Sequence, residues 1–381
     1  MTPRGLRTEP TPTPRSLGYR MPAEWERHES TWLAWPHNRT DWPGKFDAIR
    51  WVYADIVRHL SRVEDVNVIA GSSRAKDKAR EVLTLSHADL KRIKFHVWPT
   101  DRGWTRDSGP IFVKADRKAV KADRKAVKAD RKAEPASLAA TNWRFNAWAK
   151  YPDWKLDNQL PERMAKKLKL KQFKPVVELN GRPYHVVLEG GSIDVNGQGL
   201  MLTTEECLLS KVQQRNPGLS RRELERVFTD YLGIEKVIWL GCGIVGDDTH
   251  GHVDDISRFV AADTVLTAVE PSRGDANYEP LRENLRRLRA ATDLQGRKLQ
   301  IVELPLPRPV IFRSQRLPAS YANFYIANNL VLVPTFNGPH DRIALNILAG
   351  VFPKHEIVGI HCGDLIWGLG AIHCMTQQQP T

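Results

Sequence analysis

Apolar residues along this chain follow two alternating spacings. Short apolar runs typical of buried strands occupy residues 31–35, 66–70 and 93–98, and amphipathic helical spacing fills 46–60 and 75–85. The second half repeats this mixture, with strands expected at 186–188, 236–240, 265–268, 330–334 and 355–360, and helices at 221–232, 278–290 and 343–351. Strands therefore come in small groups between single helices, which predicts a mixed α/β fold.

No linker rich in Pro, Gly or Ser divides the chain, so we expect one α/β domain built from several similar units. No sequence period relates these units. The motif G-x-G-x-x-G does not follow an early strand, which argues against a doubly wound dinucleotide-binding fold. Residues 1–20 are rich in Pro, Thr and Arg and lack apolar periodicity, which predicts a disordered leader before a domain over 21–381.

A charged heptad interrupts this pattern. Val113-Lys-Ala-Asp-Arg-Lys-Ala119 recurs at 120–126 and 127–133, and each copy carries three cations and one anion, so the three copies supply +6 of the net charge of +13. We expect an insertion over 113–133 that protrudes from a hairpin tip and is either helical or disordered. The alternative is a basic arm that binds nucleic acid. Because nearly half of the basic charge lies in this tract, the total charge does not by itself indicate a nucleic-acid partner.

Composition limits the class of protein further. A hydrophobic content of 41% over 381 residues is enough for a sizeable core. Four cysteines without C-x-x-C spacing are too few for a disulfide framework. The N-terminus has no apolar signal region, and no stretch of eighteen apolar residues occurs. These features predict a cytoplasmic protein without a membrane segment.

Four segments concentrate acids, glycines, histidines and a cysteine: 104–110, 188–194, 246–255 and 368–380. Each also has a structural explanation. Asp107 suits a turn, Glu189 a hairpin corner, His252 a buried imidazole, and Cys374 an inert buried thiol. Cys374 lies, however, between a segment interrupted by glycines and a run of glutamines, which is an unusual setting for a core cysteine. It is therefore a candidate nucleophile.

The histidine segment allows a metal-dependent alternative. His250-x-His252-x-Asp254 is close to the ligand run of metallo-β-lactamase-like zinc hydrolases, and imidazole with carboxylate suits zinc. The last His of that run is an Asp in this chain. A second candidate set pairs residues 361–362 with 373–374, but the order of its ligands differs from familiar zinc sites. A zinc-dependent hydrolase thus remains a hypothesis of another class.

Taken together, the segments resemble the agmatine deiminase and bacterial-type peptidylarginine deiminase family of the guanidine-modifying superfamily. The matching stretches are 21–36, 106–110, 142–148, 189–192, 251–254 and 372–374, within a resemblance that spans about 21 to 380. It implies a pentein α/β-propeller with five-fold pseudosymmetry, no metal or organic cofactor, and a homodimer. Three features depart from the pattern: the insertion at 113–133, Ala149 where Gly is expected, and Leu369 within the glycine run.

The resemblance also implies roles for individual residues. Asp107 and Asp254 hold a guanidinium, Glu189 and His252 flank the reacting carbon, and Cys374 attacks it. Apart from the resemblance, the position of Trp104 three residues before Asp107 suits either a ring face for the cation or an ordinary buried Trp. The implied reaction converts agmatine and water into N-carbamoylputrescine and ammonia through a covalent thiouronium on Cys374, as part of putrescine biosynthesis. Peptidylarginine and free arginine are the alternative substrates. Those two would call for a cationic clamp on a carboxylate, for which Arg144 is the nearby candidate.

Elementary chemistry agrees with these roles. A guanidinium has five N–H donors in a planar fork, which carboxylates grip in pairs. The protein has a pI near 9.6, yet the candidate segments are rich in acids, and local charge rather than total charge guides a ligand into a cleft. Because Cys374 is the last site residue in the chain, we expect removal of the final eight residues to leave a folded but inactive protein.

Overall fold

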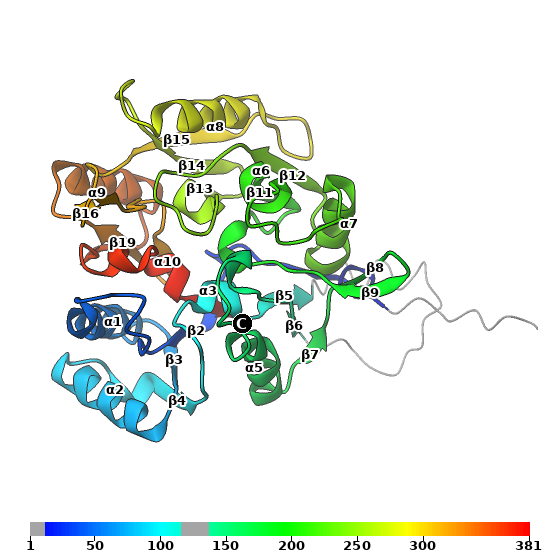
Figure 1. Cartoon of the computed structure of the whole chain (residues 1–381). Helices are drawn as coiled ribbons and strands as arrows, with labels where there is room; N and C mark the ends of the chain where they lie inside the picture. The colour runs from blue at the N-terminus through cyan, green and yellow to red at the C-terminus, as the bar shows by residue number, and fades with distance from the viewer. Residues whose placement is uncertain (1–11, 116–136) are drawn as a thin grey trace, which may run out of the picture.

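A computed structural model describes residues 12–115 and 137–381 (Figure 1). The predicted boundary of the leader at residue 20 is wrong. A short 3-10 helix, η1 (Arg15–Leu17), precedes strand β1 (Tyr19–Arg20), and β1 pairs antiparallel with β5 (Ile111–Ala115). The Tyr19 ring is buried against Phe173, with centroids 5.9 Å apart. Two anchoring residues are too few to produce a periodic signal in the sequence, and residues 1–11 lie outside the described part.

Five sheets repeat one pattern of connection. In each, the first strand is antiparallel to the second, and a helix then leads to a third strand parallel to the second. The first unit consists of β21 (Gln377–Pro380), β2 (His28–Ala34), α1 (Phe46–Leu60) and β3 (Asp65–Ala70), and the second of β5, β6 (Leu138–Thr141), α5 (Leu160–Leu168) and β7 (Lys171–Phe173). The third consists of β10 (Asp194–Val195), β11 (Leu200–Thr204), α7 (Arg221–Leu232) and β12 (Lys236–Leu240), and the fourth of β13 (Ser257–Ala261), β14 (Thr264–Val269), α8 (Tyr278–Ala290) and β15 (Gln300–Pro305). The fifth consists of β18 (Tyr325–Ala327), β19 (Leu330–Thr335), α9 (Pro339–Val351) and β20 (Glu356–His361).

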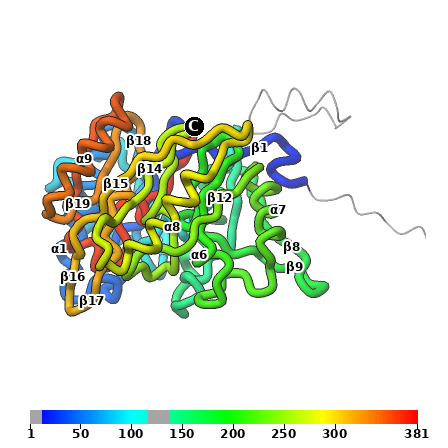
Figure 2. Tube along the Cα trace, turned by 90° about the horizontal axis from the view of Figure 1, so that it is seen from above, coloured from blue at the N-terminus to red at the C-terminus, as the bar shows by residue number. Residues whose placement is uncertain are grey.

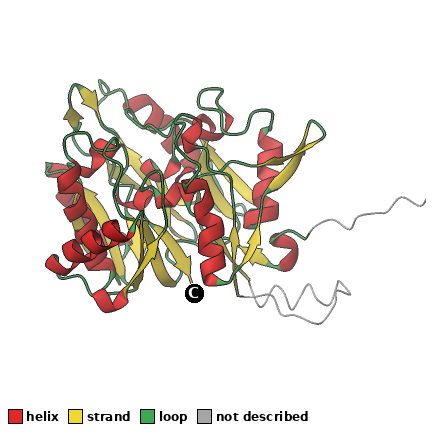
Figure 3. Cartoon of the chain, turned by 60° about the horizontal axis from the view of Figure 1, so that its bottom comes forward, coloured by secondary structure: helices red, strands yellow, loops and turns green. Residues whose placement is uncertain are grey.

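These units are arranged around a common centre. In Figure 1 the helices α1, α9, α8, α7 and α5 follow one another around the periphery, and the short helices α3 (Thr105–Ser108) and α10 (Ile372–Met375) lie near the middle. Figure 3 shows strands running beside the helices that cover them. The expected α/β pentein fold with five-fold pseudosymmetry is confirmed. The first unit is extended by α2 (Ser73–Leu85) and β4 (Ile93–Val97), which pairs parallel with β3.

Local patterning explains most elements. The helices expected at 46–60, 221–232 and 278–290 have the predicted bounds, because each has one apolar stripe that faces a sheet. The strand expected at 186–188 is wrong: only Val187 makes an isolated bridge, to Arg144. The strand there is β9 (Arg182–His185), paired with β8 (Val176–Leu179) in a hairpin at one edge of the molecule (Figure 2). Residues 186–188 are apolar because they run buried toward the centre.

The charged heptads begin inside a strand. Residues 113–115 belong to β5, so the predicted start of the insertion is three residues too early. The rest of the tract falls in 116–136, outside the described residues. Since β5 and β6 are antiparallel neighbours, that segment connects the two strands of a hairpin.

The C-terminal strand closes the molecule on its N-terminal part. Strand β21 pairs antiparallel with β2, and Oε1 of Gln379 accepts hydrogen bonds from Ser30 Oγ at 3.0 Å and Trp32 Nε1 at 2.9 Å. Residues 377–379 are buried although they are all Gln. The structure therefore argues against the expectation that the chain stays folded without its last eight residues. Among the described helices, none is both long and apolar enough to cross a membrane.

Candidate active site

Each of the five units contributes a polar side chain from the segment just before its first strand. These segments meet at the centre of the pseudosymmetric ring, which is how residues far apart in the chain become neighbours. All of the side chains are buried. They are Cys374 of α10 before β21, Asp107 of α3 before β5, Glu189 before β10, His252 and Asp254 at the turn η6 (Val253–Asp255) before β13, and Asn323 before β18.

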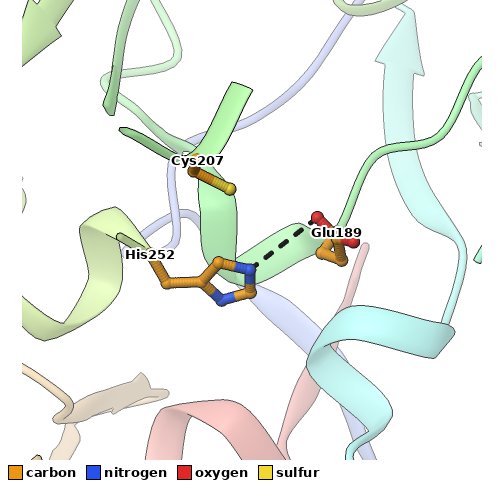
Figure 4. A group of neighbouring side chains, drawn as sticks. All are labelled: Glu189, Cys207 and His252. Carbon is orange, nitrogen blue, oxygen red and sulfur yellow. Dashed lines mark ion pairs between the residues drawn. The ribbon is translucent and has the colours of Figure 1, made fainter. Parts of the chain in front are cut away.

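The imidazole of His252 lies among three carboxylates. Its Nε2 is 3.8 Å from Glu189 Oε2 (Figure 4), and its Nδ1 is 3.8 Å from Asp107 Oδ1 and 4.0 Å from Asp254 Oδ1. These separations are too long for hydrogen bonds. Both ring nitrogens of His252, Glu189 Oε2 and Asp254 Oδ1 are buried without a hydrogen-bond partner among the described residues. Four such atoms in one place are typical of a polar ligand site, because buried polar groups are otherwise paired.

Asp107 is held by two donors. Trp148 Nε1 donates to Oδ2 at 2.9 Å and the Gly191 amide donates to Oδ1 at 3.0 Å. A Cβ at position 191 would lie 2.6 Å from His252 Nδ1, so only glycine fits between these side chains. Burial raises the pKa of Asp107 to about 6, with Asp254 and Glu189 adding to the effect. Trp148 belongs to a stretch that matched the family pattern but had received no role.

Glu189 is fixed by a cation that the sequence did not reveal. Arg215 Nε donates to Glu189 Oε1 at 3.0 Å, and both side chains are fully buried. Burial alone would raise the pKa of Glu189, but the Arg215 guanidinium outweighs it and holds that pKa at about 2. The free oxygen Oε2 therefore faces His252 as part of a charged carboxylate.

Asp254 is oriented by the residue next to the candidate nucleophile. His373 Nδ1 lies 2.6 Å from Asp254 Oδ2, and its Nε2 lies 2.7 Å from Glu24 Oε2. Glu24 in turn pairs with Arg106 at 3.2 Å and Arg258 at 2.8 Å. Burial opposes the charge on Asp254, but the hydrogen bond to His373 outweighs it and lowers the pKa of Asp254.

The thiol of Cys374 faces both an amide and acids. Asn323 Nδ2 donates to Sγ at 3.1 Å, and Sγ lies 3.7 Å from Asp254 Oδ2. Burial raises the pKa of Cys374 well above its usual range, and the carboxylates of Asp254, Asp255 and Asp107 raise it further. The thiol is therefore protonated in the unliganded protein at neutral pH. A cation bound among these carboxylates would favour the thiolate.

A cavity of about 270 Å³ leads to this sulfur, and its lining includes Cys374, Asp107, Trp104 and Trp148. Trp104 is buried and packs on Trp42 with ring centroids 5.4 Å apart. It therefore lines the cavity, and its contact with a bound cation stays a prediction. The outer part is lined by paired charges, with Arg102 joined to Asp41 and the acid Asp248 joined to Lys150.

The structure does not gather the zinc set His250, His252 and Asp254. His250 Nε2 contacts Ser210 Oγ at 3.1 Å, away from the buried His252. In the described part of the chain, the groups close enough to share an ion are Glu189, Cys207 and His252 (Figure 4), and Asp254, Asp255 and Cys374. Both groups consist of residues in or beside the site described above. The specific zinc-hydrolase arrangement is thus not supported by the geometry.

Comparison with known proteins agrees with this geometry. The sequence model of the Porphyromonas-type peptidyl-arginine deiminase family matches residues 20–380. The chain belongs to this family. It is 35% identical over 397 residues to the agmatine deiminase of Pseudomonas aeruginosa (strain LESB58), covering 98% of both chains. It is 34% identical over 395 residues to that of Pseudomonas syringae pv. tomato, covering 97% of both.

Solved structures of the same family have the same fold. An agmatine deiminase of Enterococcus faecalis superimposes with a TM-score of 0.84 at 30% identity, over 97% of this chain and 98% of that one. An agmatine deiminase of C. jejuni gives a TM-score of 0.76 at 28% identity, over 95% and 96%.

In this deiminase-family chain, sequence reasoning missed the residues that support the predicted set: Glu24, Trp148, Arg215, Asn323 and His373. Three of them lay inside matched stretches, Glu24 within 21–36, Trp148 within 142–148 and His373 beside Cys374, and could have been noticed there. Arg215 and Asn323 carry no motif. They act through tertiary contacts alone.

Proposed function

We propose that this protein is an agmatine deiminase that converts agmatine and water into N-carbamoylputrescine and ammonia, with Cys374 as nucleophile. The observation that carries the proposal is the set of buried atoms on Glu189, His252 and Asp254 that have no hydrogen-bond partner in the described part of the chain, beside a cavity that reaches the Cys374 sulfur. A guanidinium supplies planar N–H donors to such acceptors. The agmatine deiminases at about 35% identity support the choice of substrate.

The carboxylates position the substrate in this proposal. Asp107 and Asp254 accept from the guanidinium nitrogens, and Glu189 accepts on the side of His252. A delocalised guanidinium is a poor electrophile, so holding its carbon in front of the sulfur and excluding water supplies much of the rate. The positive charge of the substrate also offsets the acids that disfavour the Cys374 thiolate.

Catalysis then needs two steps. The thiolate attacks the guanidinium carbon, the C–S bond forms, and a tetrahedral adduct results. The departing nitrogen takes a proton, its C–N bond breaks, and ammonia leaves a thiouronium on Cys374. Water attacks the same carbon and gives one proton to the imidazole. As the C–S bond breaks, the second proton of that water passes to the sulfur, and the ureido product and the Cys374 thiol are released.

His252 is the proton carrier for both steps. Burial opposes its charge, but the Asp107 carboxylate and Glu189 outweigh burial, and the pKa of His252 is raised well above its usual range. An imidazolium can therefore protonate the leaving ammonia. The resulting neutral imidazole can take the proton from the attacking water.

The cavity rim favours agmatine over substrates with a carboxylate. Arg144, the candidate clamp, places its guanidinium over the Trp154 ring at 5.4 Å and is not among the residues that line the cavity. Arg102 does line it, but pairs with Asp41 and Asp153. Asp41 Oδ2 is buried without a hydrogen-bond partner among the described residues, so it can accept from the distal ammonium of agmatine.

The location and assembly of the enzyme belong to the same proposal. All four cysteines are free thiols, which supports a cytoplasmic location. The family resemblance supports a homodimer that acts on a small cationic substrate rather than on nucleic acid.

Ammonia release from agmatine, arginine and a peptidylarginine tests the function. We expect agmatine to be preferred in the presence of a chelator, and Cys374→Ala to abolish turnover while keeping the circular dichroism of the wild type. Turnover by Cys374→Ala would overturn the mechanism. A preference for peptidylarginine would overturn the substrate assignment and keep the chemistry.

A further inference from the structure

The unit that begins with β18 places an asparagine against the reacting sulfur. Asn323 is 1% exposed and makes four polar contacts. Its Nδ2 lies 3.1 Å from Cys374 Sγ and 2.9 Å from Asp255 Oδ1. Its Oδ1 accepts from the backbone amides of His373 at 2.9 Å and Cys374 at 3.4 Å. The amide group is thus fully satisfied by the nucleophile segment and its acidic neighbour.

These contacts fix the orientation of the amide. A backbone N–H can only donate, so the two amides of α10 must face the oxygen of Asn323. The NH₂ group is then left facing Sγ and Asp255, and flipping the side chain would set donors against donors. The hydrogen bond to sulfur therefore follows from the geometry of α10.

The sulfur has few favourable neighbours otherwise. The titratable groups that face it are Asp254 and Asp255 of η6, Asp107 of α3 and Tyr53 of α1, together with the adjacent His373. None of the acids stabilises a thiolate. Among the described residues, Asn323 is the one side chain that donates a hydrogen bond to Sγ.

We propose that Asn323 is a catalytic residue of this site, which stabilises the Cys374 thiolate through Nδ2 while Oδ1 holds the first turn of α10 in place. This role rests on the proposed function in one respect only, that Cys374 reacts as a thiolate. It gives the fifth unit of the chain a part in the chemistry beside the four units already assigned. A neutral donor suits this position, because a cationic side chain would compete with the guanidinium for the same carboxylates.

The substitution Asn323→Asp removes the hydrogen-bond donor to Cys374 Sγ and keeps the acceptor for the α10 amides. The aspartate keeps an oxygen to accept from the two α10 amides but presents a second oxygen, without a hydrogen, to the sulfur. We expect the rate of Cys374 alkylation by iodoacetamide to fall at least ten-fold at pH 7.5, and its pH midpoint to rise by at least one unit. We expect kcat for agmatine to fall at least thirty-fold and KM to stay the same or decrease.

Peptide mass spectrometry gives a site-resolved readout. The exposed Cys242 is an internal reference whose alkylation rate should not change, whereas Cys207 and Cys362 are buried. Asn323→Ala is the second variant in case the aspartate impairs folding, and its thiol should also lose reactivity. Circular dichroism and unfolding curves show whether each variant is folded.

The outcomes separate this proposal from the proposed function. Wild-type alkylation of Cys374 in folded Asn323→Asp or Asn323→Ala would overturn the role of Asn323, even if kcat fell. A wild type that does not deiminate agmatine, but whose Cys374 reactivity falls in Asn323→Asp, would overturn the substrate assignment and support Asn323.

Discussion

His373 Nδ1 lies 2.6 Å from Asp254 Oδ2, although 119 residues separate the two in the sequence. The residue beside the nucleophile therefore orients a carboxylate of another unit of the ring. Through its other nitrogen, 2.7 Å from Glu24 Oε2, the same ring is tied to a third segment of the chain. The position of Cys374 and the orientation of Asp254, the carboxylate proposed to bind substrate, thus both depend on His373.

This relationship predicts a loss of activity in His373→Leu. The substitution leaves Asp254 buried without its charge-assisted hydrogen bond, which contributes about 1.5–3 kcal/mol. We expect kcat/KM for agmatine to fall about 10- to 100-fold by the same principle. His340→Leu is the control, since His340 Nδ1 contacts the Leu306 carbonyl at 2.7 Å and His340 does not line the cavity formed by the described residues. Equal losses in both variants would argue for a general folding defect.

The buried pair of Arg215 and Glu189 predicts a large cost for Arg215→Met. Removing one partner of such a pair leaves an uncompensated charge and costs about 3–5 kcal/mol of unfolding free energy. Urea-induced unfolding measures this change. Arg286→Met, at an ion pair on the outer face of α8, should leave the urea midpoint unchanged. If Arg215→Met is as stable as the wild type, Glu189 does not depend on this cation.

The raised pKa of Asp107 predicts a pH dependence. The charged form is the one that binds a guanidinium, and burial raises the pKa of Asp107 to about 6, so protonation as pH falls through that value removes a binding group. Plots of log kcat/KM against pH should gain one further unit of slope below about pH 6. Asp107→Asn should lose about 1.5–3 kcal/mol of binding.

A second acid serves as the control for that profile. Asp41 also lines the cavity, and burial raises its pKa to about 7. Because Asp41 is proposed to bind the substrate ammonium, Asp41→Asn should remove its own inflection near pH 7 and keep the one near pH 6. A wild-type profile without an inflection between pH 5 and 7 would contradict the assignment to Asp107.

Two departures from the family pattern predict stabilising substitutions. Ala149 and Leu369 stand where glycines were expected, and both have left-handed backbone, with φ of 53° and 67°. This conformation is unfavourable for residues with a Cβ, so Ala149→Gly and Leu369→Gly should each stabilise the fold by about 1 kcal/mol. Ala349→Gly in α9 is the matched control and should destabilise by a similar amount. Urea unfolding of the three variants measures whether each substitution raises or lowers the free energy of unfolding.

The strain near Ala149 also has a structural purpose. Residues 147–149 are all left-handed, with φ of 50°, 58° and 53°, and this turn points Trp148 Nε1 at Asp107. Sequence comparison could show that a glycine was missing. It could not show that the same turn carries a donor into the site.

Local patterning made part of the fold predictable. Helices such as α1 and α7 were correct to the residue because an amphipathic stripe and a cap are encoded within one segment, as Ser220 and Glu223 show at the start of α7. Residues 186–188 were mistaken for a strand because apolar residues are equally suited to a buried non-paired segment. The role of β21, made of Gln377 to Pro380, was invisible because its burial comes from pairing with β2 at the other end of the chain.

The sequence by itself determined the α/β class and the five side chains proposed for chemistry, because helices are local and the motifs around Asp107, Glu189, His252, Asp254 and Cys374 are short and specific. Only the tertiary structure decided how these side chains are set. Arg215 keeps Glu189 ionised, His373 orients Asp254, and Asn323 donates a hydrogen bond to the sulfur. These three supporting residues belong to three different units of the ring. The physical reason is that hydrogen bonds and burial act over a few ångströms in space, whereas the residues that supply them are up to a hundred or more positions apart in the chain.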